Sequence, residues 1–391
     1  MFDPEEIPEL KKSIRDCAYS DRKLLDDLRL EVILLKSNVR VIKPRTTTTV
    51  SLVASDGGNN KLIYDPFYFQ LVRVVDSNGN KLCLDTISPT TDTDVISAKQ
   101  FDALGSPITA LGRLMKDLGC ETLNKLSPMI PSGKKMRENP DQVSKSWVLT
   151  YRDVCEWAVL YDKICYTRFA TNTLIVRDGL LRSKIFNYIS ASKRALFIEM
   201  INNMNRAIEE AYIKDRIRIY LVGLAKHSQV LSRYSLVMQL EDVIPRGEPR
   251  YARVPFELEE KSYTWKEFIW RPDDDKSNQE INKFSMGHLY LVRFGKLNSD
   301  PIWAVDLLPT QSSSDSEIFG YLLADSINGF PVPHYPLCLQ KAHEHAQVVG
   351  FDMDILQDEV IKAMKEIIPE DKREIIDFQV FNTDQSLNRY E

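Results

Sequence analysis

The sequence predicts an α/β protein with a mixed central β-sheet that is flanked by helices and carries insertions. Runs of β-branched and apolar residues, such as "FYFQLVRVV" and "RIYLVGLAK", are typical of strands. Between them lie stretches in which apolar residues recur every three or four positions, as in amphipathic helices. After a first helical stretch, three strands are followed by helix, strand, helix, strand, hairpin and helix. This order favours a sheet covered by helices.

The N-terminal part is expected to form a helical segment and three strands. Residues 4–37 have helical periodicity. "VRVIKPRTTTTVSLVAS" turns to period-two, β-branched character and predicts a strand that ends at Asp56, where "GGNNK" has the composition of a turn. "FYFQLVRVV" is the second strand, and the Asn-Gly pair in "DSNGNKLCLDTI" predicts a hairpin into the third. We expect an antiparallel meander.

The rest of the chain alternates between helices and strands. Residues 88–146 resemble an insertion, and residues 151–166 predict a helix that leads into the strand "NTLIVRDGLL". A helix over about 189–214 precedes the strand "RIYLVGLAK". The polar stretch 242–283 predicts loops over a site, and "GHLYLVRFG" with "PIWAVDLLP" predicts a hairpin. A proline-rich turn then enters a helix at "YPLCLQKAHEHA", and a last helix covers about 354–367.

Composition narrows the class of protein. The 391 residues have a formal net charge of −5 and a pI near 5.7, which excludes a globally basic nucleic-acid coat but leaves room for a local basic groove. The six cysteines form no C-x-x-C pair, as expected for reduced thiols in a cytoplasmic protein. Neither a signal-peptide core nor an apolar run of membrane-spanning length occurs, so we expect a soluble intracellular protein.

Two apolar strands run into an Asp-Gly pair, at Asp56 and Asp178. If the strands are neighbours in one sheet, their carboxylates lie close together, which is unfavourable unless a cation lies between them. Hard oxygen ligands of this kind select Mg²⁺ or Mn²⁺. The alternative interpretation is that Asp-Gly is a common turn dipeptide after a strand.

Two further charged residues are candidates. Glu156 lies in an apolar part of the predicted helix just before the second Asp-Gly strand and could complete an Asp–Glu–Asp set, or else pair with Arg152 four residues earlier. Lys226 follows an apolar strand, where it could stabilise a phosphate or developing negative charge. It could equally be a solvated strand end.

Tyr335 and His343 bracket the start of the helix "YPLCLQKAH". A neutral histidine there could bind a metal or position an attacking water, although single helix histidines are usually structural. The chain lacks the G-x-x-x-x-G-K-[ST] phosphate loop and the G-x-S-x-G elbow. We therefore expect neither ATP hydrolysis nor serine-hydrolase chemistry.

Taken together, these motifs resemble the NurA nuclease family. The similar parts are "VASDGG", "EWAVLYDK", "LIVRDGLLR", "LVGLAKHS", "HLYLVRFG" and "GFPVPHYPLCLQKAHEHA", which occur in the family's order over roughly residues 45–350. The last motif is the most specific of the six. The first motif departs from the family, because Gly58 stands where a serine is commoner.

The resemblance implies an RNase H-like nuclease domain over residues 45–350, preceded by a helical segment over 1–44 and followed by a helix and tail over 351–391. It implies a Mn²⁺- or Mg²⁺-dependent deoxyribonuclease that acts from DNA ends, as a 5′–3′ exonuclease with possible single-strand endonuclease action. The implied partners are a HerA-type hexameric ATPase and a second copy of the chain, in DNA end resection or anti-phage defence. The residues that match the family's metal ligands are Asp56, Glu156 and Asp178, and those that match its supporting residues are Lys226, Tyr335 and His343.

Two other functions fit the same residues. The chain could be a non-catalytic DNA clamp or regulatory subunit of such a motor, or an RNase H-like enzyme that acts on RNA.

Overall fold

The computed structural model describes residues 6–45, 51–64, 67–186, 188–189, 194–262, 269–270, 283–348 and 351–373, and for residues 51–64 and a few others beside the gaps it describes the backbone alone. The chain divides into two compact units, which are described separately. Unit 1 comprises residues 1–55 and 160–341, and unit 2 comprises residues 56–159 and 342–391.

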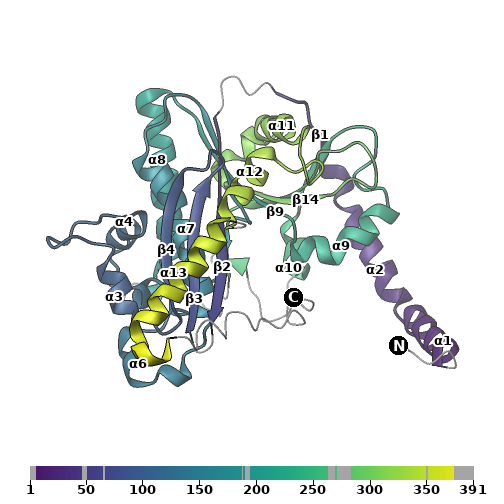
Figure 1. The fold of residues 1–391 in the computed structure, drawn as a ribbon. Coiled ribbons are helices and arrows are strands. Elements are labelled where there is room, and N and C mark those ends of the chain that lie inside the picture. The colour runs from purple at the N-terminus through teal and green to yellow at the C-terminus, as the bar shows by residue number, and fades with distance from the viewer. Residues whose placement is uncertain are drawn as a thin grey trace. The chain divides into compact units, whose positions relative to one another are not determined.

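Unit 1 is built on a mixed sheet (Figure 1). Its strands are hydrogen-bonded in the order β1 (Val39–Val41), β10 (Arg250–Arg253), β13 (His288–Arg293), β14 (Trp303–Leu307), β9 (Ile219–Ala225), β5 (Thr173–Asp178) and residues 51–55 of β2 (Ser51–Tyr64). The strands β2, β5 and β9 are parallel, whereas the other neighbours are antiparallel. Every residue of β9 and β14 is buried, as expected for central strands covered on both faces.

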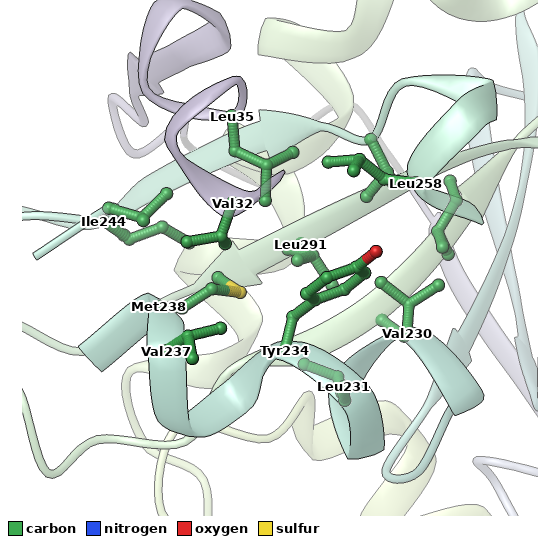
Figure 2. Packing of buried hydrophobic residues seen from close by; sticks show 14 residues of the cluster. Val32, Leu35, Val230, Leu231, Tyr234, Val237, Met238, Ile244, Leu258 and Leu291 are labelled. Atoms are coloured by element: carbon green, nitrogen blue, oxygen red, sulfur yellow. The ribbon is translucent and has the colours of Figure 1, made fainter. Parts of the chain in front are cut away.

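Unit 1 also contains helices, three of which share an apolar cluster with the sheet. The helices of unit 1 are α1 (Glu6–Ser20), which has no buried residue, α2 (Arg22–Ile33), α8 (Leu196–Asp215), α9 (Gln229–Leu240), α10 (Phe256–Ser262), α11 (Asp315–Ser326) and residues 337–341 of α12 (Leu337–Ala346). Figure 2 shows one cluster, in which Val32 of α2, Tyr234 of α9 and Leu258 of α10 pack over Leu291 of β13. Two small sheets belong to the same unit. In one, β12 (Lys283–Ser285) pairs with both β6 (Arg182–Ser183) and β11 (Ile269–Trp270), and in the other β7 (Tyr188–Ile189) pairs with β8 (Arg194–Ala195).

Unit 2 contains the rest of β2, then β3 (Phe67–Asp76) and β4 (Lys81–Ile87), hydrogen-bonded in that order. The predicted Asn-Gly hairpin between β3 and β4 is confirmed: Gly79 has φ of +79°, and Asp76 Oδ1 accepts hydrogen bonds from the backbone N–H of Asn78 and Asn80 at 3.0 and 2.9 Å. Unit 2 also contains residues 147–159 of the long helix α7 (Trp147–Tyr166), as well as α13 (Phe351–Ile367) near the end of the described chain.

The stretch 88–146 contains four short helices, α3 (Thr93–Ala98), α4 (Ala110–Asp117), α5 (Leu123–Leu126) and α6 (Gly133–Glu138). Each begins after a residue whose side-chain oxygen accepts a hydrogen bond from a first-turn N–H; these residues are Asp92, Thr109, Thr122 and Ser132. Such caps satisfy backbone donors that short helices otherwise leave unpaired.

The predicted α/β class is confirmed, with a mixed sheet flanked by helices, in which β3 and β4 are antiparallel neighbours and β2, β5 and β9 are parallel. One local prediction is wrong, because β2 does not end at Asp56 but continues through "GGNNK" to Tyr64. Pairing along the sheet outweighs the low strand propensity of glycine and asparagine here.

Other segments differ from the expected pattern as well. The described part of the stretch 242–283 contains β10, α10 and β11 besides loops. The helices α9 and α11 had no predicted counterpart. In α11, residues 318–323 are all buried, so the helix has no polar face to reveal its period. Among the described helices we find none whose length and hydropathy would suit a bilayer crossing.

Candidate active site

Asp178 is the last residue of β5, between two parallel neighbours. Gly179 then takes φ of +108°, a conformation that suits glycine, and donates its N–H to the Leu224 carbonyl at 2.7 Å. A Cβ on Gly223 would lie 2.7 Å from both Gly179 O and Leu181 N, so this glycine lets the chain cross closely over β9. The predicted apolar strand that ends at an Asp-Gly pair is confirmed here, and the Asp178 side chain is 22% exposed.

Lys226 lies between a buried strand and a capped helix. It directly follows β9, and Ser228 Oγ accepts a hydrogen bond from Leu231 N at 3.1 Å to cap α9. Lys226 Nζ is 4.0 Å from Asp178 Oδ2, and the lysine side chain is 36% exposed. Its ammonium group therefore faces the candidate carboxylate and remains accessible to a ligand.

Tyr335 joins these two residues from a distant part of the chain. It is buried, and its hydroxyl donates a hydrogen bond to Asp178 Oδ1 at 3.3 Å. Lys226 Nζ lies 4.8 Å from the centroid of the Tyr335 ring, within cation–π range. The Trp303 ring packs against the same ring with a centroid separation of 4.9 Å. Tyr335 therefore orients the carboxylate and supports the lysine at the same time.

The side chain of Gln340 makes three hydrogen bonds to the loop before α12. Its Nε2 donates to the carbonyl oxygens of Tyr335 at 2.8 Å and Val332 at 3.1 Å, and its Oε1 accepts from Val332 N at 2.9 Å. A Cβ on Gly329 would lie 2.5 Å from Tyr335 O, so the loop closes only over a glycine. Trp303 Nε1 also donates to His334 O at 2.8 Å. These contacts fix the backbone of Tyr335.

Glu156 is described within unit 2, in α7. Its Oε1 lies 3.4 Å from Arg152 Nε, and its side chain is 13% exposed. Arg152 also donates to Asp153 Oδ1 at 2.8 Å. The pairing with Arg152 that the sequence offered as an alternative is therefore present, and it leaves a carboxylate with limited access to solvent.

His343 is exposed on α12, where its Nε2 is 2.9 Å from Gln347 Nε2. The side chain of Asp56 falls outside the residues whose side chains are described. Among the described side chains no group of three histidine, cysteine, aspartate or glutamate residues is placed to hold a metal ion. Asp178 offers one ligand whose chemistry suits a divalent cation, a partly exposed carboxylate at a strand end.

Two buried cysteines near the predicted residues hold their protons. Burial and the neighbouring Asp325 carboxylate raise the pKa of the Cys338 thiol, and the hydrogen bond with Cys83 together with burial raises the pKa of Cys155.

Sequence reasoning missed three residues that support the site: Gly223, Trp303 and Gln340. Gly223 had a visible signal, because a glycine inside the apolar run "IYLVGLA" indicates close approach of another backbone. Trp303 and Gln340 had no such signal in the sequence, because their hydrogen-bond partners lie in the loop "FPVPHYP". The conformation of this loop cannot be predicted from a local sequence pattern.

No protein family and no curated protein matches this sequence. Among solved structures, the chain is similar to the NurA nuclease from Sulfolobus solfataricus, with 13% identity and a TM-score of 0.41 over 94% of this chain and 99% of that one. It is similar to NurA with manganese, with 13% identity and a TM-score of 0.38 over 94% and 99% of the two chains. A third similar structure is Marinitoga piezophila Argonaute in complex with 5′ OH guide RNA, with 11% identity and a TM-score of 0.25 over 77% of this chain and 30% of that one. The chain is thus similar to NurA structures over nearly its whole length.

Proposed function

We propose that this protein is a divalent-metal-dependent nuclease that hydrolyses phosphodiester bonds from DNA ends. The observation that carries the proposal is the convergence of Asp178, Lys226 and Tyr335. Asp178 and Tyr335 are 157 positions apart, yet the sequence motifs selected all three residues together. A carboxylate, an ammonium group and a tyrosine hydroxyl in mutual contact form a site suited to a phosphate ester and its counterion.

Asp56, Glu156 and Asp178 would hold one or two Mn²⁺ or Mg²⁺ ions. For Asp56 and Asp178 the proposal is supported by the parallel strands, since these residues directly follow Ser55 and Arg177, which are register partners in β2 and β5. A bound ion supplies water activation and stabilisation of the leaving oxygen.

The remaining residues act around the phosphate. Lys226 offsets charge on the scissile phosphate, because its ammonium lies beside the Asp178 carboxylate and is one-third exposed. Tyr335 holds Asp178 in orientation through its hydroxyl. His343 orients water or phosphate.

The biological setting follows from the motif resemblance. We propose that a HerA-type hexameric ATPase feeds DNA to a homodimer of this chain, which acts as a 5′–3′ exonuclease and single-strand endonuclease in end resection or anti-phage defence. The lack of a phosphate-loop motif fits a nuclease that depends on a partner for translocation. Local lysine and arginine contacts would bind DNA despite the acidic pI, and binding would weaken with salt.

The test is cleavage of end-labelled linear DNA with Mn²⁺ by the wild type and the Asp178→Asn variant. We expect a loss of about 100-fold or more, since a lost ligand removes several kcal/mol of transition-state stabilisation. Asp215→Asn is the matched control. Like Asp178, Asp215 is a partly exposed aspartate with a cationic partner, since its side chain is 31% exposed and lies 2.9 Å from Arg168. Unlike Asp178, it lies at the end of α8. Wild-type rates in Asp178→Asn would refute the site.

The same assay separates the other two functions. Mn²⁺ binding without cleavage, alone and with the ATPase, would support a DNA clamp. Cleavage of RNA or of an RNA–DNA hybrid in preference to DNA would support a ribonuclease.

A further inference from the structure

A short crossover segment, residues 179–182, connects Asp178 to the rest of unit 1. It passes over β9 at Gly223, where a Cβ would meet its backbone at 2.7 Å. The backbone is fixed at both ends: Gly179 N donates to Leu224 O at 2.7 Å, and Leu181 O accepts from Met286 N at 2.9 Å. The position of the crossover segment therefore sets the direction in which the chain leaves Asp178.

The crossover segment ends in a buried ion cluster. Arg182 donates to both carboxylate oxygens of Asp306, from Nε at 2.8 Å and from Nη2 at 2.6 Å, and its Nη1 donates to Glu259. The side chains of Arg182, Asp306 and Glu259 are 3%, 0% and 0% exposed. A buried guanidinium with a bidentate partner has its position fixed far more tightly than a surface ion pair.

The ion cluster includes a residue of β14 that lies beside Gly223, the residue over which the crossover segment passes. Asp306 lies in β14, where it is the register partner of Gly223 in β9. Gly287 packs directly on it, since a Cβ there would lie 2.7 Å from Asp306 Cβ. Glu259 comes from α10, whose Leu258 belongs to the apolar cluster shown in Figure 2. Arg182 thus ties the crossover segment to both the sheet and a helix.

We propose that Arg182 is a positioning residue for Asp178: by anchoring the crossover segment to Asp306 and Glu259, it fixes the carboxylate against Tyr335 and Lys226. The proposal rests on the proposed function for its catalytic consequence, but the anchoring itself has a separate readout. A displacement of about 1 Å at a reacting group can lower the rate about 100-fold, so a residue that touches no substrate can still govern turnover.

The decisive variant is Arg182→Lys. Lysine keeps the positive charge but has a single ammonium group, which cannot form the bidentate pair with Asp306 and the contact with Glu259 together. Arg293→Lys is the matched control. Arg293, which lies in β13, is likewise a buried arginine, 3% exposed, and donates to Pro245 O at 2.5 Å, away from the crossover segment.

Two measurements on each folded variant test the proposal. Amide hydrogen exchange across residues 179–182 is expected to be at least tenfold faster in Arg182→Lys than in the wild type and unchanged in Arg293→Lys. On linear DNA with Mn²⁺, kcat of Arg182→Lys is expected to fall at least tenfold while KM stays within twofold, because the lysine alters orientation and not DNA binding. If Arg182→Lys does not fold, Asp306→Asn keeps the shape of the cluster and carries the same expectations.

The outcomes distinguish this inference from the proposed function. Unchanged exchange in the crossover segment would overturn the inference whatever the activity, and so would unchanged kcat in an active protein. A wild type that cleaves no DNA would overturn the proposed function instead, and faster exchange in Arg182→Lys would still support the anchoring.

Discussion

The clamp formed by Gln340 gives the sharpest prediction, because one side chain makes three hydrogen bonds to the loop that carries Tyr335. In Gln340→Ala, Val332 N and the carbonyl oxygens of Val332 and Tyr335 lose these partners. Leaving one buried polar group unsatisfied costs about 1–3 kcal/mol, and water can reach part of the widened loop. We therefore expect a loss of about 2–3 kcal/mol in the free energy of unfolding.

For a unit of this size, 1 kcal/mol corresponds to a shift of about 2–4 °C in Tm, so the variant should melt about 4–12 °C lower. Cleavage of linear DNA, measured well below that temperature, should also fall, because Tyr335 loses its backbone support. Gln239→Ala removes the same side chain from an exposed position of α9 and serves as the control. A Tm within about 1 °C of wild type in Gln340→Ala, together with full activity, would refute the clamp.

Three further predictions test individual contacts. Tyr335→Phe keeps the ring but removes the hydroxyl group that donates a hydrogen bond to Asp178 Oδ1 at 3.3 Å. Loss of so long a hydrogen bond to a charged group costs about 1.5 kcal/mol, so kcat/KM should fall about tenfold. A fall of less than twofold would contradict this role of Tyr335. Burial opposes ionisation of Glu31, but the hydrogen bonds that it accepts from Tyr234 and Lys261 prevail and lower its pKa below 4.5. In urea unfolding, the wild type should therefore exceed Glu31→Gln in free energy of unfolding by its full margin above pH 4.5. This margin should disappear as the pH falls through the lowered pKa. Gly223→Ala should reduce the free energy of unfolding by about 1–3 kcal/mol through overpacking against the crossover segment, which thermal unfolding would detect.

The positions of Asp178 and Lys226 could be predicted because local patterns determine them. Each follows an apolar strand, β5 or β9, and parallel neighbouring strands bring their carboxyl ends to the same edge of the sheet. The contact of Tyr335 with Asp178 could not be derived in this way, since it depends on the loop over 329–336 and on a separation of 157 positions. Only the resemblance of whole motifs linked the two residues in advance.

The prediction for the first Asp-Gly pair was weaker for a physical reason. At residues 178 and 179 the dipeptide ends a strand, and Gly179 uses its positive φ to turn over β9. At residues 56 and 57 the same dipeptide lies inside a strand that continues to Tyr64. The Asp-Gly sequence indicates which backbone conformations are allowed, but pairing with neighbouring strands of the sheet determines which of them the chain adopts.

The carboxylates of the buried cluster and of the candidate site differ in burial and in the lengths of their contacts. Asp306 is 0% exposed and receives two charged hydrogen bonds at 2.6 and 2.8 Å, so it is committed to Arg182. Asp178 is 22% exposed, and its contacts with Tyr335 and Lys226 are longer, at 3.3 and 4.0 Å. An incoming cation or phosphate can compete with contacts of that length, while it would have to break a desolvated bidentate pair at Asp306. Because only four positions separate Asp178 from Arg182, the tightly held cluster can keep the accessible carboxylate in place without occupying its oxygens.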